Sequence, residues 1–279
     1  MTAFPGRVAA ITGAGSGIGR ALAADLARRG ANVALSDVDE AGLADTVALC
    51  QGRGVTVTSA RVDVADRASV HAWADAVVAD HGKVNMVFNN AGVAVAATVE
   101  QLSYDDLEWL MSINFWGVVH GTKAFLPHLK ASGEGHVINI SSVFGLVSVP
   151  TQSAYCAAKF AVRGFTDTLR MELEIDRSPV KALTVHPGGI KTNIARRARV
   201  DPAIAAEAGG DPSADFDKVA MTSPEKAARQ ILAAVEADRR RVLVGPDAKV
   251  IDLVHRLPTR LYQGALIRGG RRGRKRVIV

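Results

Sequence analysis

The sequence predicts an α/β fold in which helices cover both faces of a parallel sheet. Short apolar runs of strand length alternate with segments of helical spacing along most of the 279 residues, and this alternation is typical of parallel sheets. A glycine-rich turn separates the first expected strand from the first expected helix. Polar motifs follow several later strands, at the carboxyl ends where such sheets bind ligands.

Apolar runs bounded by turn residues predict strands at 7–12, 31–36, 55–62, 84–88, 136–141, 180–186 and 241–244. Capping residues followed by apolar residues at helical spacing predict the helices between them. Asp66 is expected to cap a helix that reaches about His81, and Ser103 a long helix that reaches about Leu129. The other expected helices cover 20–29, 39–51, a stretch that begins at Ser153, and 224–237.

Residues 193–222 differ in composition from the rest, being rich in Ala, Gly, Asp and Pro without a clear strand. We expect a mobile loop with short helical pieces there, which would act as a lid over a substrate pocket. With this lid, residues 1–247 are expected to form one domain.

Composition narrows the class of protein. Cys50 and Cys156 are too few for a disulfide framework, and the seven scattered histidines show no metal-ligand spacing, so no metal site is expected. No apolar run reaches transmembrane length, and no signal-peptide pattern begins the chain. We therefore expect a cytoplasmic protein.

The glycine turn G-A-G-S-G-I-G is the first candidate ligand site. It holds Gly13, Gly15, Gly17 and Gly19 between a strand and a helix, which is the context in which a pyrophosphate approaches the backbone and the helix N-terminus. The spacing is G-x-x-x-G-x-G rather than the strict G-x-G-x-x-G. The alternative is a glycine-rich turn that binds no ligand.

Acids after the second and third strands favour a particular dinucleotide. Asp37 could bind both hydroxyls of the adenosine ribose, and its charge would repel a 2′-phosphate. No arginine or lysine stands at Ser16 or Val38 to neutralise that phosphate, so NAD is favoured over NADP. The alternative for Asp37 is a helix cap, a task for which Asp39 competes. Asp63, followed by Val64, could contact the adenine amine.

Tyr155 and Lys159 are four residues apart and therefore share one face of a helix. A phenol has an ordinary pKa of about 10, and a neighbouring ammonium is expected to lower that pKa enough for acid–base chemistry. By itself the spacing is weak evidence, since it occurs by chance in many helices, where it is usually a solvated face.

Two stretches that contain asparagine give weaker evidence of a functional site. The N-N-A-G stretch at 89–92 is either a simple turn or a source of amides that fix neighbouring strands. Asn114 lies within an expected helix beside apolar residues, where it would either hold a water at a local distortion or cross-link the core.

Taken together, these motifs resemble the short-chain dehydrogenases/reductases over about residues 7–244. The matching residues are T-G-A-G-S-G-I-G at 12–19, Asp63, N-N-A-G at 89–92, Asn114, Ser142, Y-C-A-A-K at 155–159, P-G at 187–188, and Thr192. The resemblance implies a Rossmann-like, doubly wound parallel sheet of about seven strands in three αβα layers. It also implies a homotetramer or homodimer formed through the helices around Asn114 and Tyr155.

The resemblance further implies a catalytic tetrad of Asn114, Ser142, Tyr155 and Lys159, with Ser142 preferred to Ser141 by its spacing from Tyr155. Tyr155 would exchange a proton with a secondary alcohol or ketone while hydride passes to or from NAD. Ser142 would bind the substrate oxygen, Lys159 the nicotinamide ribose, and Asn114 a water that links Lys159 to solvent. The expected cofactor contacts are Gly13, Gly15, Ser16, Gly17, Ile18, Gly19, Asp37, Asp63, Val64, Asn90, Ala91, Gly92, Tyr155, Lys159, Pro187, Gly188, Ile190 and Thr192.

The expected pocket segments, 93–99, 143–150 and parts of 193–222, are apolar, which favours a lipophilic alcohol or ketone. Two alternatives use the same fold: an NADP-linked carbonyl reductase and a catalytically silent, cofactor-binding regulatory protein. Specific nucleic-acid binding is not expected, because the basic tail lacks interleaved aromatic residues.

The C-terminal region departs from a minimal member of the family. Residues 248–267 form an amphipathic extension that Pro258 interrupts. Residues 268–279 carry six basic residues and no acid, which accounts for the whole net charge of +6. We favour a helix that packs on the body or on another subunit, followed by a disordered, solvated tail. The alternative is weak, peripheral association with an anionic membrane.

Overall fold

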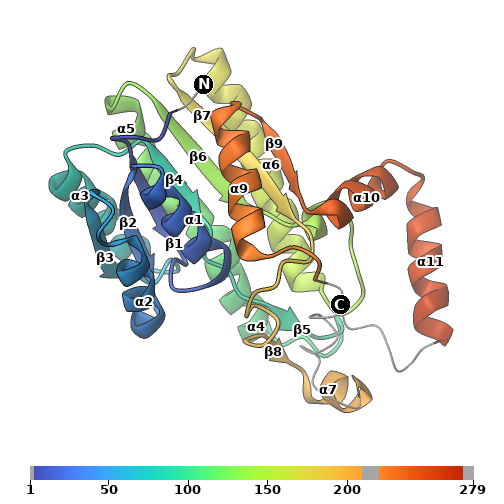
Figure 1. The fold of residues 1–279 in the computed structure, drawn as a ribbon. Coiled ribbons are helices and arrows are strands. Elements are labelled where there is room, and N and C mark those ends of the chain that lie inside the picture. The colour runs from blue at the N-terminus through green and yellow to red at the C-terminus, as the bar shows by residue number, and fades with distance from the viewer. Residues whose placement is uncertain (1–2, 209–219, 273–279) are drawn as a thin grey trace.

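In the computed structural model, which describes residues 3–208 and 220–272, seven strands form one parallel sheet in the order β3-β2-β1-β4-β6-β7-β9 (Figure 1). The strands are β1 (Val8–Thr12), β2 (Asn32–Asp37), β3 (Val57–Arg61), β4 (Met86–Asn89), β6 (Gly135–Ile140), β7 (Val180–Pro187) and β9 (Arg241–Val244). The doubly wound, seven-stranded α/β fold is thus confirmed. The order changes direction between β1 and β4, and ligands bind in such sheets at this switch point.

Helices cover both faces of the sheet, as expected. One layer consists of α1 (Gly17–Arg28), α2 (Glu40–Cys50) and α9 (Pro224–Glu236), and the other of α3 (Arg67–His81), α5 (Gly117–Ala131) and α6 (Ser153–Ile175). Successive strand residues point to opposite layers: Ile11 joins the first apolar core and Ala10 the second. Both faces of the sheet are therefore buried, which explains why the strands are continuous apolar runs.

Capping residues set the helix starts. The side chains of Asp66 and Ser103 accept hydrogen bonds from Ala68 N and Asp106 N, which confirms both predicted caps. The long helix predicted after Ser103 is interrupted: α4 (Tyr104–Met111) passes into a π-helical turn at Ser112–Trp116 before α5 begins. The local distortion considered for Asn114 is therefore present.

The segment after β7 contains a strand that the sequence did not predict. β8 (Arg199–Val200) pairs in parallel with β5 (Val95–Ala96). Two residues give too short a run for an apolar pattern, so only the tertiary pairing reveals this strand. The short helical piece expected here is α7 (Pro202–Ala208), and the part of the expected lid at 209–219 lies outside the described residues.

Beyond β9 the chain forms α10 (Pro246–His255) and α11 (Thr259–Arg272), so the predicted interruption at Pro258 is confirmed. α10 packs against β9, whereas α11 contacts α10 and stands apart from the body in Figure 1. Among the described elements α11 therefore packs on α10 rather than on the body, and packing on another subunit stays a prediction. None of the helices in the described ranges is long and apolar enough to cross a bilayer.

Candidate active site

The glycine turn forms a cradle at the switch point of the sheet. Gly13 and Gly17 have φ values of 65° and 53°, a region that favours glycine. A Cβ at Gly19 would lie 2.2 Å from Gly13 O, so no larger residue fits there. Ser16, the N-cap of α1, makes no side-chain capping bond, which leaves the first N–H groups of α1 available to an anion. The cradle therefore fits a dinucleotide pyrophosphate.

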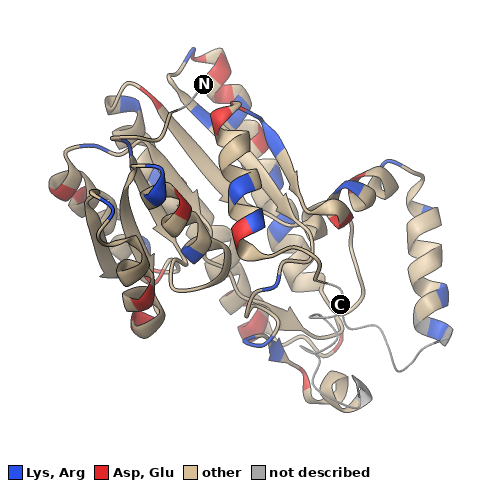
Figure 2. Cartoon of the chain, in the orientation of Figure 1, with Lys and Arg blue, Asp and Glu red and all other residues tan. Residues whose placement is uncertain are grey.

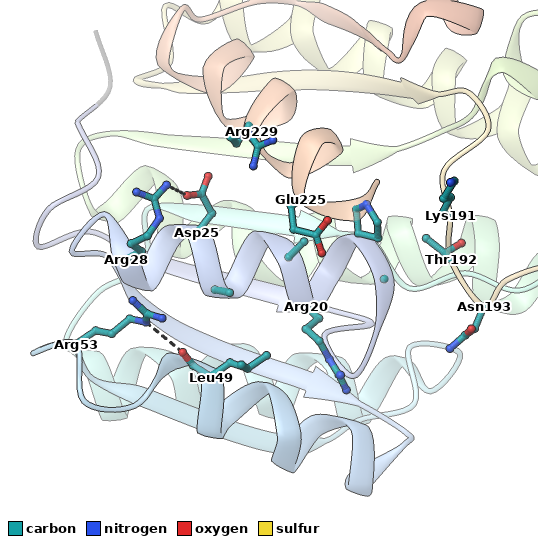
Figure 3. A pocket seen from close by; sticks show the side chains of 14 residues that line it. Arg20, Asp25, Arg28, Leu49, Arg53, Lys191, Thr192, Asn193, Glu225 and Arg229 are labelled. Carbon is teal, nitrogen blue, oxygen red and sulfur yellow. Dashed lines mark hydrogen bonds and ion pairs between the residues drawn. The ribbon is translucent and has the colours of Figure 1, made fainter. Parts of the chain in front are cut away.

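Thr192 lies beside this cradle, since its Cγ2 is 3.0 Å from the position of a Cβ on Gly17. Gly17 and Thr192 also line one end of a cavity of about 540 Å³ that runs along the outer side of α1 (Figure 3). The cavity wall carries basic side chains such as Arg28 and Arg229, and Tyr155 does not line it. This cavity is thus distinct from the expected reaction centre.

Asp37 ends β2 and lies against the glycine turn. Its carboxylate accepts hydrogen bonds from Gly15 N (2.7 Å) and Asp39 N (2.9 Å). The cap of α2 is Asp39, whose side chain accepts from Gly42 N, so Asp37 is not the helix cap. Arg197, which the sequence did not single out, pairs with Asp39 at 2.9 Å. The segment that follows Thr192 thus reaches across to the start of α2.

The N-N-A-G stretch ties neighbouring strands together, which is one of its two predicted roles. Asn89 Nδ2 donates to Asn139 Oδ1 on β6 at 2.8 Å, and Asn90 Nδ2 donates to Thr12 O on β1 at 2.9 Å. The ideal Cβ position of Gly13 lies 2.8 Å from Ala91 Cα, so the stretch packs directly on the glycine turn. These contacts hold the cradle at a fixed place on the sheet edge.

Asp63 and Val64 follow β3 at the same edge. The Asp63 carboxylate accepts from Ala65 N at 2.9 Å and remains exposed. Val64 is buried, and its carbonyl oxygen lies 3.1 Å from His120 Nδ1. Both residues are therefore held in local turns next to the expected adenine position.

Lys159 lies at the centre of the expected catalytic cluster. Its ammonium is buried, donates to Ile140 O at 2.9 Å, and stands 5.5 Å from the centroid of the Tyr155 ring. A Cβ on Gly92 would lie 3.7 Å from Lys159 Nζ and 3.3 Å from Asn114 Oδ1. Three segments distant in sequence thus converge beside the Tyr155 ring.

The pKa values differ from the sequence-based expectation. Burial raises the pKa of Tyr155 to about 12, although a hydrogen bond with Ser142 acts in the opposite direction. Burial also lowers the pKa of Lys159 to about 8. The prediction that Lys159 lowers the pKa of Tyr155 is therefore wrong for this state, because the ammonium lies over the ring and bonds the Ile140 carbonyl while desolvation dominates.

Ser142 and Ser141 have different surroundings. The Ser141 hydroxyl donates to Lys159 O at 2.8 Å and is thereby committed to the backbone of α6. Ser142 is hydrogen-bonded to Tyr155, and its Oγ also accepts from Phe144 N at 3.1 Å. His186 Nδ1, which the sequence did not suggest, lies 2.8 Å from Ser142 O, consistent with donation to that carbonyl. Burial lowers the pKa of His186 to about 4, so this histidine is neutral.

Asn114 cross-links the π-helical turn to the N-N-A-G stretch. Its Oδ1 accepts from Val93 N and its Nδ2 donates to Val93 O, both at 2.8 Å. Each side-chain group thus makes one hydrogen bond, and a water linking Lys159 to solvent could use the remaining amide positions or the distorted backbone. The cross-linking role considered for Asn114 is present.

The P-G-G turn after β7 is held by another residue that the sequence did not single out. Gly189 N donates to Asp247 Oδ2 at 2.6 Å, and Asp247 belongs to the first turn of α10. A Cβ on Gly188 would lie 2.1 Å from the same carboxylate oxygen. Pro187 ends β7 and Ile190 is buried in the core, so Asp247 fixes the turn between two anchored residues.

Comparisons with known proteins agree with this geometry. A family model described as short chain dehydrogenase matches residues 7–203. The protein SadH of Mycobacterium tuberculosis (strain ATCC 25618 / H37Rv) is 52% identical over 274 residues, which cover 96% of this chain and 97% of SadH.

Two solved structures extend the comparison. A short chain dehydrogenase/reductase from Burkholderia phymatum in complex with NAD is 32% identical with a TM-score of 0.80, covering 99% of this chain and 98% of that chain. An alcohol dehydrogenase from Thermococcus sibiricus complexed with 5-hydroxy-NADP is 26% identical with a TM-score of 0.72, covering 85% of this chain and 94% of that chain.

Proposed function

This chain belongs to the short-chain dehydrogenase family, and from that premise we propose that it transfers a hydride between NAD(H) and a lipophilic secondary alcohol or ketone. The observation that carries the proposal is the convergence of Lys159, Tyr155 and Ser142 at the sheet edge that also holds the glycine cradle. Acid–base residues and a nucleotide cradle on one edge suit redox chemistry at a carbon–oxygen bond.

In the proposed reaction, Tyr155 is the proton carrier. The bound dinucleotide would supply the hydride donor or acceptor. With a pKa of about 12, the phenol of Tyr155 is neutral and ready to donate a proton to a carbonyl oxygen. Ser142 would hold that oxygen while negative charge develops on it. In the oxidative direction Tyr155 must first lose its proton, which a cation beside its oxygen would favour.

NAD is the proposed cofactor because the Asp37 carboxylate lies at the glycine turn, where the adenosine ribose would bind. A 2′-phosphate at this place would meet that negative charge. An NADP-linked reductase remains the second candidate, favoured by one observation: Arg197 reaches the neighbouring Asp39 and is therefore close enough to the start of α2 to face a phosphate. The ratio of kcat/KM for the two cofactors decides between them.

A lipophilic substrate is proposed from the surroundings of Tyr155. The Phe144 ring packs edge-on against it with centroids 6.2 Å apart, and Val93 and Trp109 belong to the same apolar cluster as Tyr155. Arg199 lies over the Trp109 ring at 3.6 Å and bonds Asp106 at 2.8 Å, which ties the segment after Thr192 to this wall. We take residues 193–222 as the substrate lid of a single catalytic domain over 1–247.

We also propose a cytoplasmic homodimer or homotetramer. Large apolar side chains are exposed on the π-helical turn and α6, namely Trp116, Phe160, Met171 and Ile175. Exposed apolar residues on neighbouring helices favour a subunit interface there. Mass photometry of the wild-type chain measures the oligomer size.

The test of the reaction is a panel of secondary alcohols and ketones, followed by absorbance of the reduced nicotinamide with NAD(H) and NADP(H). Tyr155→Phe keeps the ring and removes the proton carrier, so we expect turnover to fall by about 10²–10⁴-fold while cofactor binding persists. Unchanged turnover in this variant would refute the assignment of Tyr155. Cofactor binding without turnover of any substrate in the wild type would instead favour the catalytically silent regulatory protein.

A further inference from the structure

The C-terminal helix α11 exposes apolar side chains without a partner in the described part of the chain. α11 contacts α10 and makes no substantial contact with any other described element. In α11, Leu261 and Ile267 are both 51% exposed. Leu257, which lies between the two helices, is 48% exposed, and α10 adds Val250 and Leu253 at 61% and 65%. Large apolar residues exposed in succession on a helical extension mark an interaction surface.

The charge of the same region is strongly one-sided. Residues 253–279 contain eight lysines and arginines and no acidic residue. Since the whole chain carries +6, residues 1–252 have a net charge of −2. Figure 2 shows basic residues and no acidic ones on α11, whereas both signs alternate over the body. The partner that covers α11 must therefore be compatible with concentrated positive charge.

A second copy of the same helix fits poorly, because pairing two such helices would bring like charges together. The body of another subunit, with a net charge of −2 spread over 252 residues, offers only weak attraction. A lipid surface with anionic headgroups satisfies both features at once, since apolar side chains insert at the acyl boundary while arginines contact the headgroups.

The dimensions of α11 agree with a helix that lies on a bilayer. Fourteen residues extend roughly 21 Å at 1.5 Å each, which is shorter than the hydrocarbon core of about 30 Å. Leu261 and Ala265 are four residues apart, as are Tyr262 and Leu266, so these two neighbouring pairs form one apolar stripe along the helix. Arg260, Arg268 and Arg271 are exposed on the same helix, as an interfacial helix requires.

We propose that α11, together with the exposed residues of α10, binds the surface of membranes that contain anionic lipid. α10 also carries Asp247, which holds Gly189 of the P-G-G turn at 2.6 Å. Binding at α11 therefore places the carboxyl edge of the sheet near the lipid surface. For the lipophilic substrate suggested above, and resting on that proposed function, this position would give access to molecules dissolved in the bilayer.

The test is flotation of the full-length chain with vesicles of phosphatidylcholine alone or mixed with phosphatidylglycerol. We expect binding to the mixed vesicles only, and its loss at high salt because exposed charges are then screened. The triple variant Arg260→Gln, Arg268→Gln, Arg271→Gln should lower the partition coefficient roughly 100-fold, given about fivefold for each cation near an anionic surface. Activity is not part of this readout, so its result is independent of the proposed reaction.

A matched variant removes the same charge from the body. Lys83→Gln, Lys130→Gln and Lys226→Gln alter exposed residues outside the extension and should leave binding within about twofold. The double variant Leu261→Gln, Ile267→Gln should weaken binding at least tenfold, which isolates the apolar contribution. Circular dichroism of each variant checks that the fold is retained.

Three results would overturn the proposal. The first is failure of the wild type to float with the mixed vesicles. The second is an equal loss of vesicle binding in the two triple variants. The third is a lower oligomer mass in the Leu261→Gln, Ile267→Gln variant with unchanged vesicle binding, which would assign the α11 face to a contact between subunits.

Discussion

The amino and carboxyl edges of the central sheet both bury polar side chains, but they use them differently. At the amino edge, buried Arg170 donates to Glu174 at 2.5 Å and to Asp238 at 3.0 Å, and Asn85 Oδ1 accepts from Val8 N at 3.0 Å. These polar groups satisfy one another. At the carboxyl edge, the buried Lys159 ammonium has a single hydrogen-bond acceptor among the described residues, the Ile140 carbonyl.

At the carboxyl edge, positive φ values and desolvated titratable groups meet at one site. There the glycine turn adopts positive φ values, and burial raises the pKa of Tyr155 while lowering that of Lys159. The difference between the edges teaches that burial by itself does not mark a functional residue. Because His136 at the amino edge is also buried without a hydrogen-bond partner in the described part of the chain, what marks the carboxyl edge is the convergence of titratable groups with shifted pKa values beside the glycine cradle.

The largest effect expected from this comparison is on turnover. Lys159→Met should lower kcat by about 10²–10⁴-fold, without loss of unfolding free energy at pH 7, because a desolvated ammonium is removed. The matched amino-edge variant, Arg170→Met, should lose about 1–3 kcal/mol of stability by leaving its acidic partners unpaired, while the folded fraction keeps its kcat. Steady-state kinetics and urea unfolding measure both. If Arg170→Met impaired kcat as strongly as Lys159→Met, the functional distinction between the edges would fail.

Lys159 also predicts a dependence of stability on pH. Its folded pKa of about 8 lies below the ordinary value of 10.5, so the unfolded chain binds the proton more strongly. This contribution makes the unfolding free energy rise as pH increases from about 8 towards 10.5. The raised pKa of Tyr155 acts in the opposite direction above pH 10. Between pH 8 and 9.5, Lys159→Met should therefore remove a rise in stability that the wild type shows in urea unfolding.

The next expected effect distinguishes two buried histidines that lie at opposite edges of the sheet, His136 on β6 and His186 on β7. Burial lowers the pKa of each to about 4 from 6.5, although Asp238 faces His136 and Asp167 faces His186. The unfolded chain binds protons more strongly in this window, so stability is fully present above pH 6.5 and falls as pH drops towards 4. Each histidine should contribute up to about 3 kcal/mol of that loss.

Replacing either histidine with Gln should reduce, by a similar amount, the loss of unfolding free energy that urea unfolding shows as the pH falls. Only His186→Gln should also lower kcat, because His186 lies against the Ser142 carbonyl while His136 contacts no part of the site. Parallel measurements of kcat and unfolding between pH 4.5 and 7.5 check this pair. Equal kinetic defects in the two variants would contradict a positioning role for His186.

A smaller effect is expected at Asp247, which supports the carboxyl edge from α10. Asp247→Ala leaves Gly189 N without its acceptor and should raise the Kd for NAD about tenfold, the equivalent of a hydrogen bond to a charged group of about 1.5 kcal/mol. Asp247→Asn keeps an acceptor oxygen and should restore most of the affinity. Fluorescence titration of the reduced cofactor measures both. Failure of the Asn variant to recover affinity would show that charge, rather than the hydrogen bond, is required.

The smallest effect concerns Arg197, whose ion pair with Asp39 joins the segment after Thr192 to the start of α2. The Arg197 side chain is 62% exposed, so the pair should contribute less than about 1 kcal/mol to stability. We expect Arg197→Gln to leave the melting temperature unchanged and to alter the rate of NAD(H) release two- to fivefold, a size in keeping with an exposed pair. Stopped-flow measurement of cofactor release tests this, and an altered melting temperature would indicate a structural role instead.

The sequence by itself determined the order of the main strands and helices, the caps at Asp66 and Ser103, and the glycine cradle. It also placed Tyr155 and Lys159 on one helix face. These features depend on residues within a few positions of one another, because apolar spacing, capping and positive φ are local properties of the chain.

Only the tertiary structure decided the contacts between distant segments. The short pairing of β5 with β8, the support of Ser142 by His186 and of Gly189 by Asp247, and the separation of α11 from the body are of this kind. The pKa of Tyr155 belongs with them: Lys159 is a neighbour in sequence, yet desolvation by the surrounding fold outweighs its charge. Burial and hydrogen-bond partners are properties of the packed chain, so no local pattern contains them.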